Sequence, residues 1–136
     1  MGAPSVNLGT MPVVRILLVE DSSAMRAFVR AALEEEREIE ITEAASGFEA
    51  LRLLPRQPYD LVITDIHMPD INGLEVISFM RKSEAHKATP LLIISTEAAA
   101  KDRDRALALG ADGFLSKPFE AVALKDAVVR LGRKDG

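Results

Sequence analysis

The chain has 136 residues, of which 48% are hydrophobic, and this is the size of one compact domain with a core of its own. It contains no cysteine, which excludes disulfides, thiolate zinc sites and a cysteine nucleophile. A formal net charge of −4 and only five Phe, one Tyr and no Trp argue against a basic surface or a base-stacking platform, so we expect no direct nucleic-acid binding.

The chain begins with a segment that shows no pattern of a folded element. Residues 1–12 hold two Gly, two Pro and no periodicity, which predicts a flexible leader. This segment lacks the basic start and apolar middle of a signal peptide, and no apolar run approaches the roughly eighteen residues that cross a bilayer. We therefore expect a cytoplasmic protein without membrane contact, with its domain at residues 13–132 and a short flexible tail at residues 133–136.

Short apolar runs rich in β-branched residues alternate with stretches of helical periodicity along the rest of the chain. Strands of a parallel sheet are buried on both faces, so their sequences are almost wholly apolar. Five runs are candidates for such strands, and several of them are almost wholly apolar: Val13–Val19, Ile39–Glu43, Leu61–Thr64, Leu91–Ser95 and Gly113–Leu115. The alternation predicts an α/β fold of five βα units.

Each run is followed by a segment with the periodicity or the stop signals of a helix. Apolar residues recur at helical spacing from Met25 to Leu33 and again from Gly73 to Met80. We expect five helices on both faces of the sheet, because crossover connections in parallel sheets are right-handed. The three other segments end at helix-stopping residues: Ser46–Leu54 before Pro55, Ala98–Leu109 at Gly110 and Glu120–Leu131 at Gly132.

Acidic, hydroxyl and lysine side chains stand at the carboxyl ends of four predicted strands, where ligands bind in such open sheets. These residues are Glu20 and Asp21, Asp65, Ser95, and Lys117. Like charges at 4 Å repel by roughly 4 kcal/mol at an effective dielectric near 20, so three gathered carboxylates need a cation. Oxygen ligands without a His or Cys cluster favour Mg²⁺. A carboxylate nucleophile, Mg²⁺, a lysine and a hydroxyl group together indicate phosphoryl transfer.

These residues and the motifs around them resemble the receiver domain of two-component response regulators. The resemblance spans roughly Val14 to Leu131, and it is specific because the motifs follow one another in order at successive strand ends. It implies a flavodoxin-like sheet with strand order 2-1-3-4-5 and a cis peptide bond within Lys117-Pro118. The motifs are Glu20-Asp21, Asp65 with Met68-Pro69 and Asn72-Gly73, Ser95, and Lys117-Pro118-Phe119.

The resemblance also implies a role for each site residue. Asp65 would accept a phosphoryl group from a sensor histidine kinase, a phosphotransfer protein or a small donor such as acetyl phosphate. Lys117 would pair with that group, and Ser95 would donate a hydrogen bond to one of its oxygens. The protein would catalyse only its own phosphorylation and a slow autodephosphorylation, so we do not expect an enzyme. The implied Mg²⁺ ligands are Asp21, Asp65, the backbone carbonyl of His67 and, through a metal-bound water, Glu20.

Three further roles follow from the resemblance. Phe114, three residues before Lys117, takes the place of an aromatic switch residue. With Ser95 it would change the surface of the fourth helix, fifth strand and fifth helix, and so control a downstream protein or an attached output domain. His67 and Glu97 stand two residues after the phosphoacceptor and the hydroxyl residue, where they would tune the lifetime of the acyl phosphate.

Other functions share part of this pattern. An aspartate-nucleophile phosphohydrolase needs a second Asp two residues after the first, where this chain has His67. A nucleotide-binding module needs a Gly-rich phosphate loop, which the sequence lacks. A receiver that works without phosphorylation is disfavoured by the intact acidic, lysine and hydroxyl positions. The sequence leaves open a stand-alone receiver or part of a longer regulator or hybrid kinase, and a monomer or a phosphorylation-dependent dimer.

Some of these residues also have a simpler interpretation. Phe114 could be a plain core residue, as most aromatics on strands are. Glu20 and Asp21 could cap the helix that follows them. His67 and His86 are interpreted as solvated residues rather than metal ligands, because neither has a second His or Cys at ligand spacing.

Overall fold

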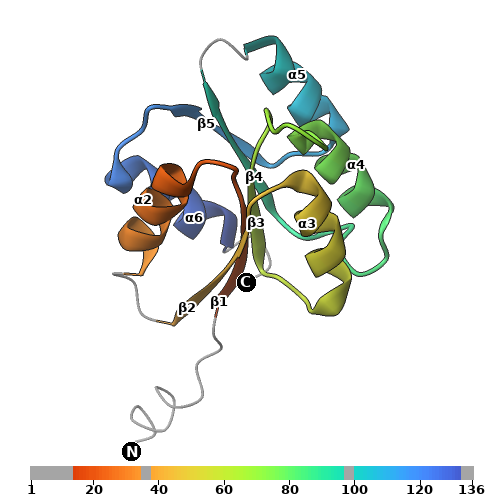
Figure 1. The fold of residues 1–136 in the computed structure, drawn as a ribbon, viewed down its shortest axis with the longest axis horizontal. Helices are drawn as coiled ribbons and strands as arrows, with labels where there is room; N and C mark the ends of the chain where they lie inside the picture. The colour runs from red at the N-terminus through yellow and green to blue at the C-terminus, as the bar shows by residue number, and fades with distance from the viewer. Residues whose placement is uncertain (1–13, 35–37, 97–99, 133–136) are drawn as a thin grey trace, which may run out of the picture.

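The computed structural model describes residues 14–34, 38–96 and 100–132. Within these ranges the chain forms five βα units (Figure 1). The strands are β1 (Val14–Val19), β2 (Ile39–Ala44), β3 (Leu61–Asp65), β4 (Leu91–Thr96) and β5 (Gly113–Lys117). The helices are α2 (Ser23–Leu33), α3 (Gly47–Leu53), α4 (Gly73–Lys82), α5 (Ala100–Leu109) and α6 (Ala121–Gly132), with a 3-10 turn η1 (Leu54–Arg56) after α3.

The strands form one parallel sheet in the order β2-β1-β3-β4-β5, which confirms the predicted α/β fold and strand order. Helices α2 and α6 cover one face of this sheet, and α3, α4 and α5 cover the other (Figure 1). The register pairs Asp65 with Ile94 and Thr96 with Lys117. The carboxyl ends of the strands therefore lie at one edge, where the loops of the candidate site meet.

The core lies in two layers, one on each face of the sheet, and β1 contributes to both. Its residues alternate, so that Leu17 and Val19 are buried against the α3 to α5 side while Ile16 and Leu18 are buried against α2 and α6. Side chains that point to opposite faces are thus equally apolar. This two-sided burial explains why the central strands β1, β3 and β4 are visible in the sequence as apolar runs. No helix in the described ranges is long and apolar enough to cross a bilayer.

The structure corrects several predicted boundaries. Strands β3 and β5 extend beyond the apolar runs to Asp65 and Lys117, because the backbone ladder continues although the side chains become polar. Helix α3 ends at Leu53, and the chain continues as a 3-10 turn with Pro55 near its start, where a missing N–H costs no hydrogen bond. Val13, Ala98 and the predicted segments 1–12 and 133–136 lie outside the described residues.

The cap of α2 also differs from the alternative that the sequence allowed. Neither Glu20 nor Asp21 is the N-cap; that residue is Ser22, whose hydroxyl oxygen accepts a hydrogen bond from the Met25 N–H at 3.2 Å. Glu20 instead accepts a hydrogen bond from the backbone N–H of Ser22 at 2.9 Å. The two acidic side chains are thus left to face the neighbouring strand ends.

Gly73, at the start of α4, lies tightly against the end of β3. A Cβ atom at this position would lie 2.3 Å from the carbonyl oxygen of Asp65, and the Gly73 N–H donates to the Ile66 carbonyl at 2.8 Å. Gly73→Ala is therefore expected to lower the free energy of unfolding by about 1–3 kcal/mol, as overpacking does. Urea denaturation measures this change.

The matched control is Gly132→Ala, because a Cβ atom there would meet nothing within 4 Å. The same chemical change at this helix position should leave the stability unchanged or raise it slightly, since Ala favours helix by up to about 1 kcal/mol over Gly. Equal losses at both positions would contradict the role of close backbone approach at Gly73.

Candidate functional site

Three of the predicted site residues are in direct contact at the carboxyl edge of the sheet. The Lys117 ammonium donates to Glu20 Oε1 at 2.8 Å and to Asp65 Oδ2 at 2.9 Å. Asp65 and Lys117 end β3 and β5, and Glu20 follows β1, with its N–H still bonded to the Ala44 carbonyl at 3.0 Å. The continuing β ladder thus fixes the backbone of all three residues.

Asp21 completes an acidic cluster with Glu20 and Asp65. One carboxylate oxygen from each residue lies within 4.8 Å of the other two. Glu20 and Asp65 are buried, whereas Asp21 is exposed and opens the cluster to solvent. One lysine does not neutralise three carboxylates, and an all-oxygen donor set that reaches solvent fits a hard divalent cation such as Mg²⁺.

Burial and pairing shift the pKa values of two of these groups. Burial raises the pKa of Glu20, and the hydrogen bonds from Lys117 and the Ser22 N–H offset this only in part, while the nearby Asp65 charge raises it further. Burial by itself would lower the pKa of Lys117, but its hydrogen bonds to Glu20 and Asp65 outweigh that effect and keep the pKa above its usual value. The lysine is therefore a fixed positive charge shared between two carboxylates.

Both carboxylate oxygens of Asp65 accept a hydrogen bond. Oδ2 faces Lys117, and Oδ1 accepts from the backbone N–H of His67 at 3.3 Å. The Asp65 side chain is 9% exposed. A neighbour, Thr64, donates its hydroxyl to the Asp65 carbonyl at 2.9 Å. The carboxylate is held in one orientation at the edge of the sheet, as a positioned nucleophile requires.

Ser95 is completely buried near the end of β4, and its hydroxyl has no hydrogen-bond partner within the described residues. Such a buried polar group is unfavourable unless a partner arrives. In the ladder Ser95 pairs with Ser116, and Thr96 with Lys117, so this hydroxyl residue lies one strand position before the lysine. An added group with oxygen acceptors would satisfy it.

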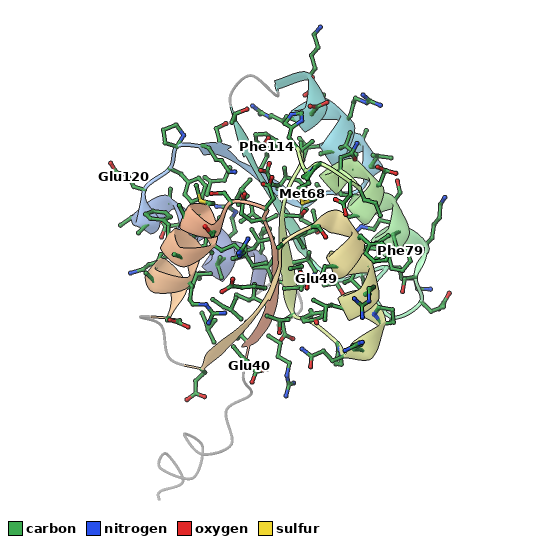
Figure 2. The ribbon with its side chains drawn as sticks, in the orientation of Figure 1. Glu40, Glu49, Met68, Phe79, Phe114 and Glu120 are labelled. Atoms are coloured by element: carbon green, nitrogen blue, oxygen red, sulfur yellow. The ribbon has the colours of Figure 1, made fainter. Side chains whose placement is uncertain are left out.

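The residues expected to tune or relay the signal differ in how they are placed. The exposed imidazole of His67 lies 3.2 Å from an Asp102 carboxylate oxygen on α5. Phe114 is half-buried and packs, like Met68, against the core layer beneath α3 to α5, toward the loop edge (Figure 2). Glu97 lies outside the described residues. The peptide bond between Lys117 and Pro118 is cis, as the resemblance implies.

The expectation that His86 is solvated is wrong. Its side chain is 1% exposed, and its ring contacts the Leu54 carbonyl through Nε2 and the Thr89 hydroxyl through Nδ1. Its ring centroid lies 6.0 Å from that of Tyr59. An imidazole can be buried when both ring nitrogens find partners, and His86 is buried in this way in a loop without periodicity, where the sequence gives no sign of burial.

Comparison with known proteins agrees with this geometry. A family model described as the response regulator receiver domain matches residues 16–129. The chain is 33% identical over 118 residues to the chemotaxis protein CheY-3 of Vibrio cholerae, covering 87% of this chain and 91% of that protein. It is 38% identical over 123 residues to a probable transcriptional regulatory protein of Picosynechococcus. That match covers 85% of this chain but 47% of the relative, so the chain spans about half of that protein's length.

Solved structures show the same arrangement of strands and helices. The receiver domain of a sensor histidine kinase from Pseudomonas aeruginosa, with a magnesium ion coordinated in its active site cleft, is 28% identical and superimposes with a TM-score of 0.80. The match covers 88% of this chain and 98% of that domain. Chains with this architecture thus occur in chemotaxis proteins, transcriptional regulators and sensor kinases.

Proposed function

Since this chain belongs to the response regulator receiver domain family, we propose that residues 13–132 form a phosphorylation-switched receiver that takes a phosphoryl group onto Asp65. The contact of Asp65 and Glu20 with Lys117, inside a cluster of three carboxylates, carries this proposal. It supplies a buried nucleophile, a fixed positive charge and an oxygen-rich cation site at one edge of the sheet. Receiver domains are generally signalling domains rather than enzymes, and we assign this chain no further reaction.

The proposed cation site consists of Asp21 and Asp65, the backbone carbonyl of His67, and Glu20 acting through water. Mg²⁺ bound there would supply positive charge against the oxygens of the incoming group. The exposed Asp21 carboxylate gives the ion access from solvent. Glu20 is held by Lys117 and by the Ser22 N–H, which leaves it at the inner wall of the site.

In the proposed transfer, a carboxylate oxygen of Asp65 forms a bond to the phosphorus of a phosphohistidine or of acetyl phosphate. The bond from phosphorus to the imidazole nitrogen or to the acetate oxygen breaks, and that group leaves with the electron pair. Lys117 would donate to a phosphoryl oxygen, and the Ser95 hydroxyl would gain a partner. Attack of water on the phosphorus later returns the Asp65 carboxylate and free phosphate.

The hydroxyl of Ser95, which has no partner among residues 14–34, 38–96 and 100–132, supports a switch. A phosphoryl group that attracts Ser95 would draw the end of β4 toward Asp65, and the half-buried Phe114 beside it could then move further into the core. Moving a population from 1:99 to 99:1 takes about 5.5 kcal/mol of differential binding. Charge-assisted hydrogen bonds of about 1.5–3 kcal/mol each, from Lys117 and Ser95, supply much of this. We propose the α5, β5 and α6 surface as the readout.

Further parts of the proposal concern the lifetime of the phosphate and the partners. His67 and Glu97 would orient the attacking water and so set the rate of autodephosphorylation. The phosphoryl donor would be a sensor histidine kinase or phosphotransfer protein in the cytoplasm. The switched surface would act on a downstream protein or an attached output domain, as a monomer or as a phosphorylation-dependent dimer, without contacting nucleic acid or membrane directly.

Phosphoryl uptake in the presence and absence of a divalent cation tests the proposal. Incubation with acetyl phosphate and Mg²⁺ should add the mass of one phosphoryl group to the intact chain, and removal of the metal with EDTA should abolish the gain. Without the metal the carboxylates repel the incoming anion. The protein with acetate and Mg²⁺ is the control. An absent mass gain with Mg²⁺, or an equal gain in EDTA, would contradict the proposed function.

A further inference from the structure

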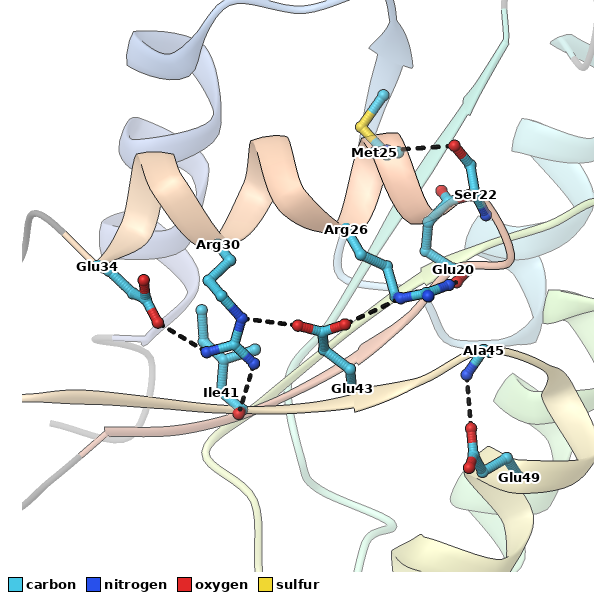
Figure 3. A network of polar contacts seen from close by, with 10 residues as sticks. All are labelled: Glu20, Ser22, Met25, Arg26, Arg30, Glu34, Ile41, Glu43, Ala45 and Glu49. Carbon is cyan, nitrogen blue, oxygen red and sulfur yellow. Dashed lines mark hydrogen bonds and ion pairs between the residues drawn. The ribbon is translucent and has the colours of Figure 1, made fainter.

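Arg26, on the first turn of α2, connects the acidic cluster to strand β2. Its Nη1 donates to the backbone carbonyl of Glu20 at 2.8 Å, and its Nε donates to Glu43 Oε1 at 2.9 Å (Figure 3). The Arg26 side chain is 20% exposed. Both hydrogen bonds are thus made to groups of the protein itself. The bond to the Glu20 carbonyl holds the peptide group that joins Glu20 to Asp21.

The bonded carbonyl is the one that orients Asp21. A peptide group is planar, so the Glu20 oxygen, the Asp21 nitrogen and both Cα atoms lie in one plane. The N–H on the other side of Glu20 is fixed by the Ala44 carbonyl at 3.0 Å. Fixing the Glu20 oxygen therefore determines the direction in which the chain leaves β1 toward Asp21.

Asp21 depends on this backbone constraint more than its neighbours do. The side chains of Glu20 and Asp65 are both held by Lys117. The structure gives the Asp21 carboxylate no hydrogen bond or ion pair to any residue in the ranges 14–34, 38–96 and 100–132. Its position within the 4.8 Å cluster is thus set mainly by the orientation of its own backbone.

Glu43 anchors Arg26 firmly. Its second carboxylate oxygen accepts a hydrogen bond from Arg30 Nε at 2.6 Å, and Arg30 also donates to Glu34 and to the Ile41 carbonyl (Figure 3). The hydrogen bond from Arg30, together with that from Arg26, holds the pKa of Glu43 below its usual range. The carboxylate between the two arginines stays charged, and the guanidinium of Arg26 is fixed by it.

We propose that Arg26 is a positioning residue for the cation site, holding the peptide between Glu20 and Asp21 in the orientation that brings the acidic cluster together. This inference rests on the proposed function, because it takes the cluster to be a Mg²⁺ site. A planar guanidinium suits the task, since it donates to a carboxylate and a carbonyl at once, which a single ammonium cannot do in the same geometry.

The positive charge of Arg26 and its positioning hydrogen bond have opposite expected effects on Mg²⁺ affinity. A positive side chain near an acidic cluster repels a divalent cation, so removing the charge alone would strengthen Mg²⁺ binding. Removing the positioning hydrogen bond would weaken it. Arg30 is the matched control, because it shares Glu43 and carries the same charge but makes no hydrogen bond to Glu20 in the described part of the chain.

The test is calorimetric titration of the full chain with magnesium chloride alone, alongside urea denaturation of each protein. Arg26→Met and Arg26→Lys should each bind Mg²⁺ about tenfold more weakly than wild type, the loss typical of residues that orient metal ligands. Arg30→Met should bind Mg²⁺ at least as tightly as wild type, although it loses more hydrogen bonds and should be less stable. The lysine variant retains the charge, so its weaker binding would identify the lost geometry as the cause.

Three outcomes would overturn the assignment. Mg²⁺ affinity unchanged in both Arg26 variants would show that the peptide orientation does not depend on Arg26. Affinity lowered equally in Arg30→Met would trace the effect to general loosening around Glu43. Absence of Mg²⁺ binding in the wild-type chain would overturn the proposed function and this inference together, whereas wild-type binding with unchanged Arg26 variants would overturn the inference alone.

Discussion

Asp65→Asn is expected to abolish phosphoryl uptake from acetyl phosphate without destabilising the fold. The amide has no anionic oxygen to attack phosphorus, so the mass gain seen with wild type should fall to background. Its carbonyl oxygen can still accept the hydrogen bond from Lys117, which now lies 2.9 Å from Asp65 Oδ2. Intact-mass measurement after incubation with acetyl phosphate and Mg²⁺ reports the first effect, and urea denaturation reports the second.

The free energy of unfolding of Asp65→Asn should equal that of wild type or exceed it by up to about 1 kcal/mol. This is the scale expected when a substitution relieves strain at a functional site. The reason is that the Asp65 charge contributes to the raised pKa of Glu20, so the two carboxylates repel each other in the folded protein. Opposite signs for activity and stability are typical of a site built for function. A marked loss of stability would instead make Asp65 a structural residue.

Asp60→Asn provides the control, because Asp60 directly precedes β3 and so lies at the opposite end of the strand from Asp65. Asp60 is exposed and accepts a hydrogen bond from the Arg15 N–H at 2.7 Å, away from the acidic cluster. This variant should take up the phosphoryl group as wild type does. An equal mass gain in wild type and Asp65→Asn would remove Asp65 from its assigned role.

The sequence predicted the fold because burial on both faces of a parallel sheet leaves a strong signal. The interiors of the central strands β1, β3 and β4 are almost wholly apolar, and the polar residue that follows each apolar run marks a strand end. Since parallel strands end at one edge, Glu20, Asp65 and Lys117 could be brought together without coordinates. The last residues of β3 and β5 were missed, because Asp65 and Lys117 are polar and so do not extend the apolar pattern.

Contacts between side chains on separate elements left no such signal. The hydrogen bond from Arg26 to the Glu20 carbonyl joins a helix side chain to a backbone atom. Every residue has a backbone carbonyl, so the sequence gives no sign of which one is bonded. The pair of His67 and Asp102 joins a loop to helix α5, and no motif in the sequence links the two residues. The burial of His86 depends on the Leu54 carbonyl, which is equally invisible in the sequence.

Lys117→Met is expected to remove phosphoryl uptake and also to destabilise the fold at neutral pH by about 3 kcal/mol, the lower end of the cost of leaving buried charges unpaired. The Lys117 side chain is 16% exposed, while those of Glu20 and Asp65 are 1% and 9% exposed. Methionine fills similar space but cannot neutralise the two carboxylates. Urea denaturation at several pH values, with and without Mg²⁺, measures the effect.

The pH dependence of this loss in the free energy of unfolding, the stability deficit of Lys117→Met, identifies its cause. The pKa of Glu20 is raised already by burial, and loss of the ammonium raises it further. A carboxyl whose folded-state pKa exceeds its unfolded value destabilises the fold once it ionises, and this cost is absent below the unfolded pKa, here the ordinary value of 4.5. The deficit of Lys117→Met should therefore be largest near neutral pH and shrink as the pH falls toward that value.

Mg²⁺ should reduce the deficit at neutral pH, because an ion that binds only the folded cluster stabilises it by mass action and replaces the missing charge. Lys87→Met is the control: Lys87 pairs with Glu84 at 3.2 Å, but both side chains are largely exposed, so its loss should cost at most about 1 kcal/mol. A deficit in Lys117→Met that is the same at low and neutral pH, and unaffected by Mg²⁺, would make the lysine a packing residue. A deficit that grows as the carboxylates ionise and shrinks with Mg²⁺ would show instead that the Lys117 ammonium stabilises Glu20 and Asp65 by its charge. A divalent cation bound to the cluster would then supply part of the same stabilisation.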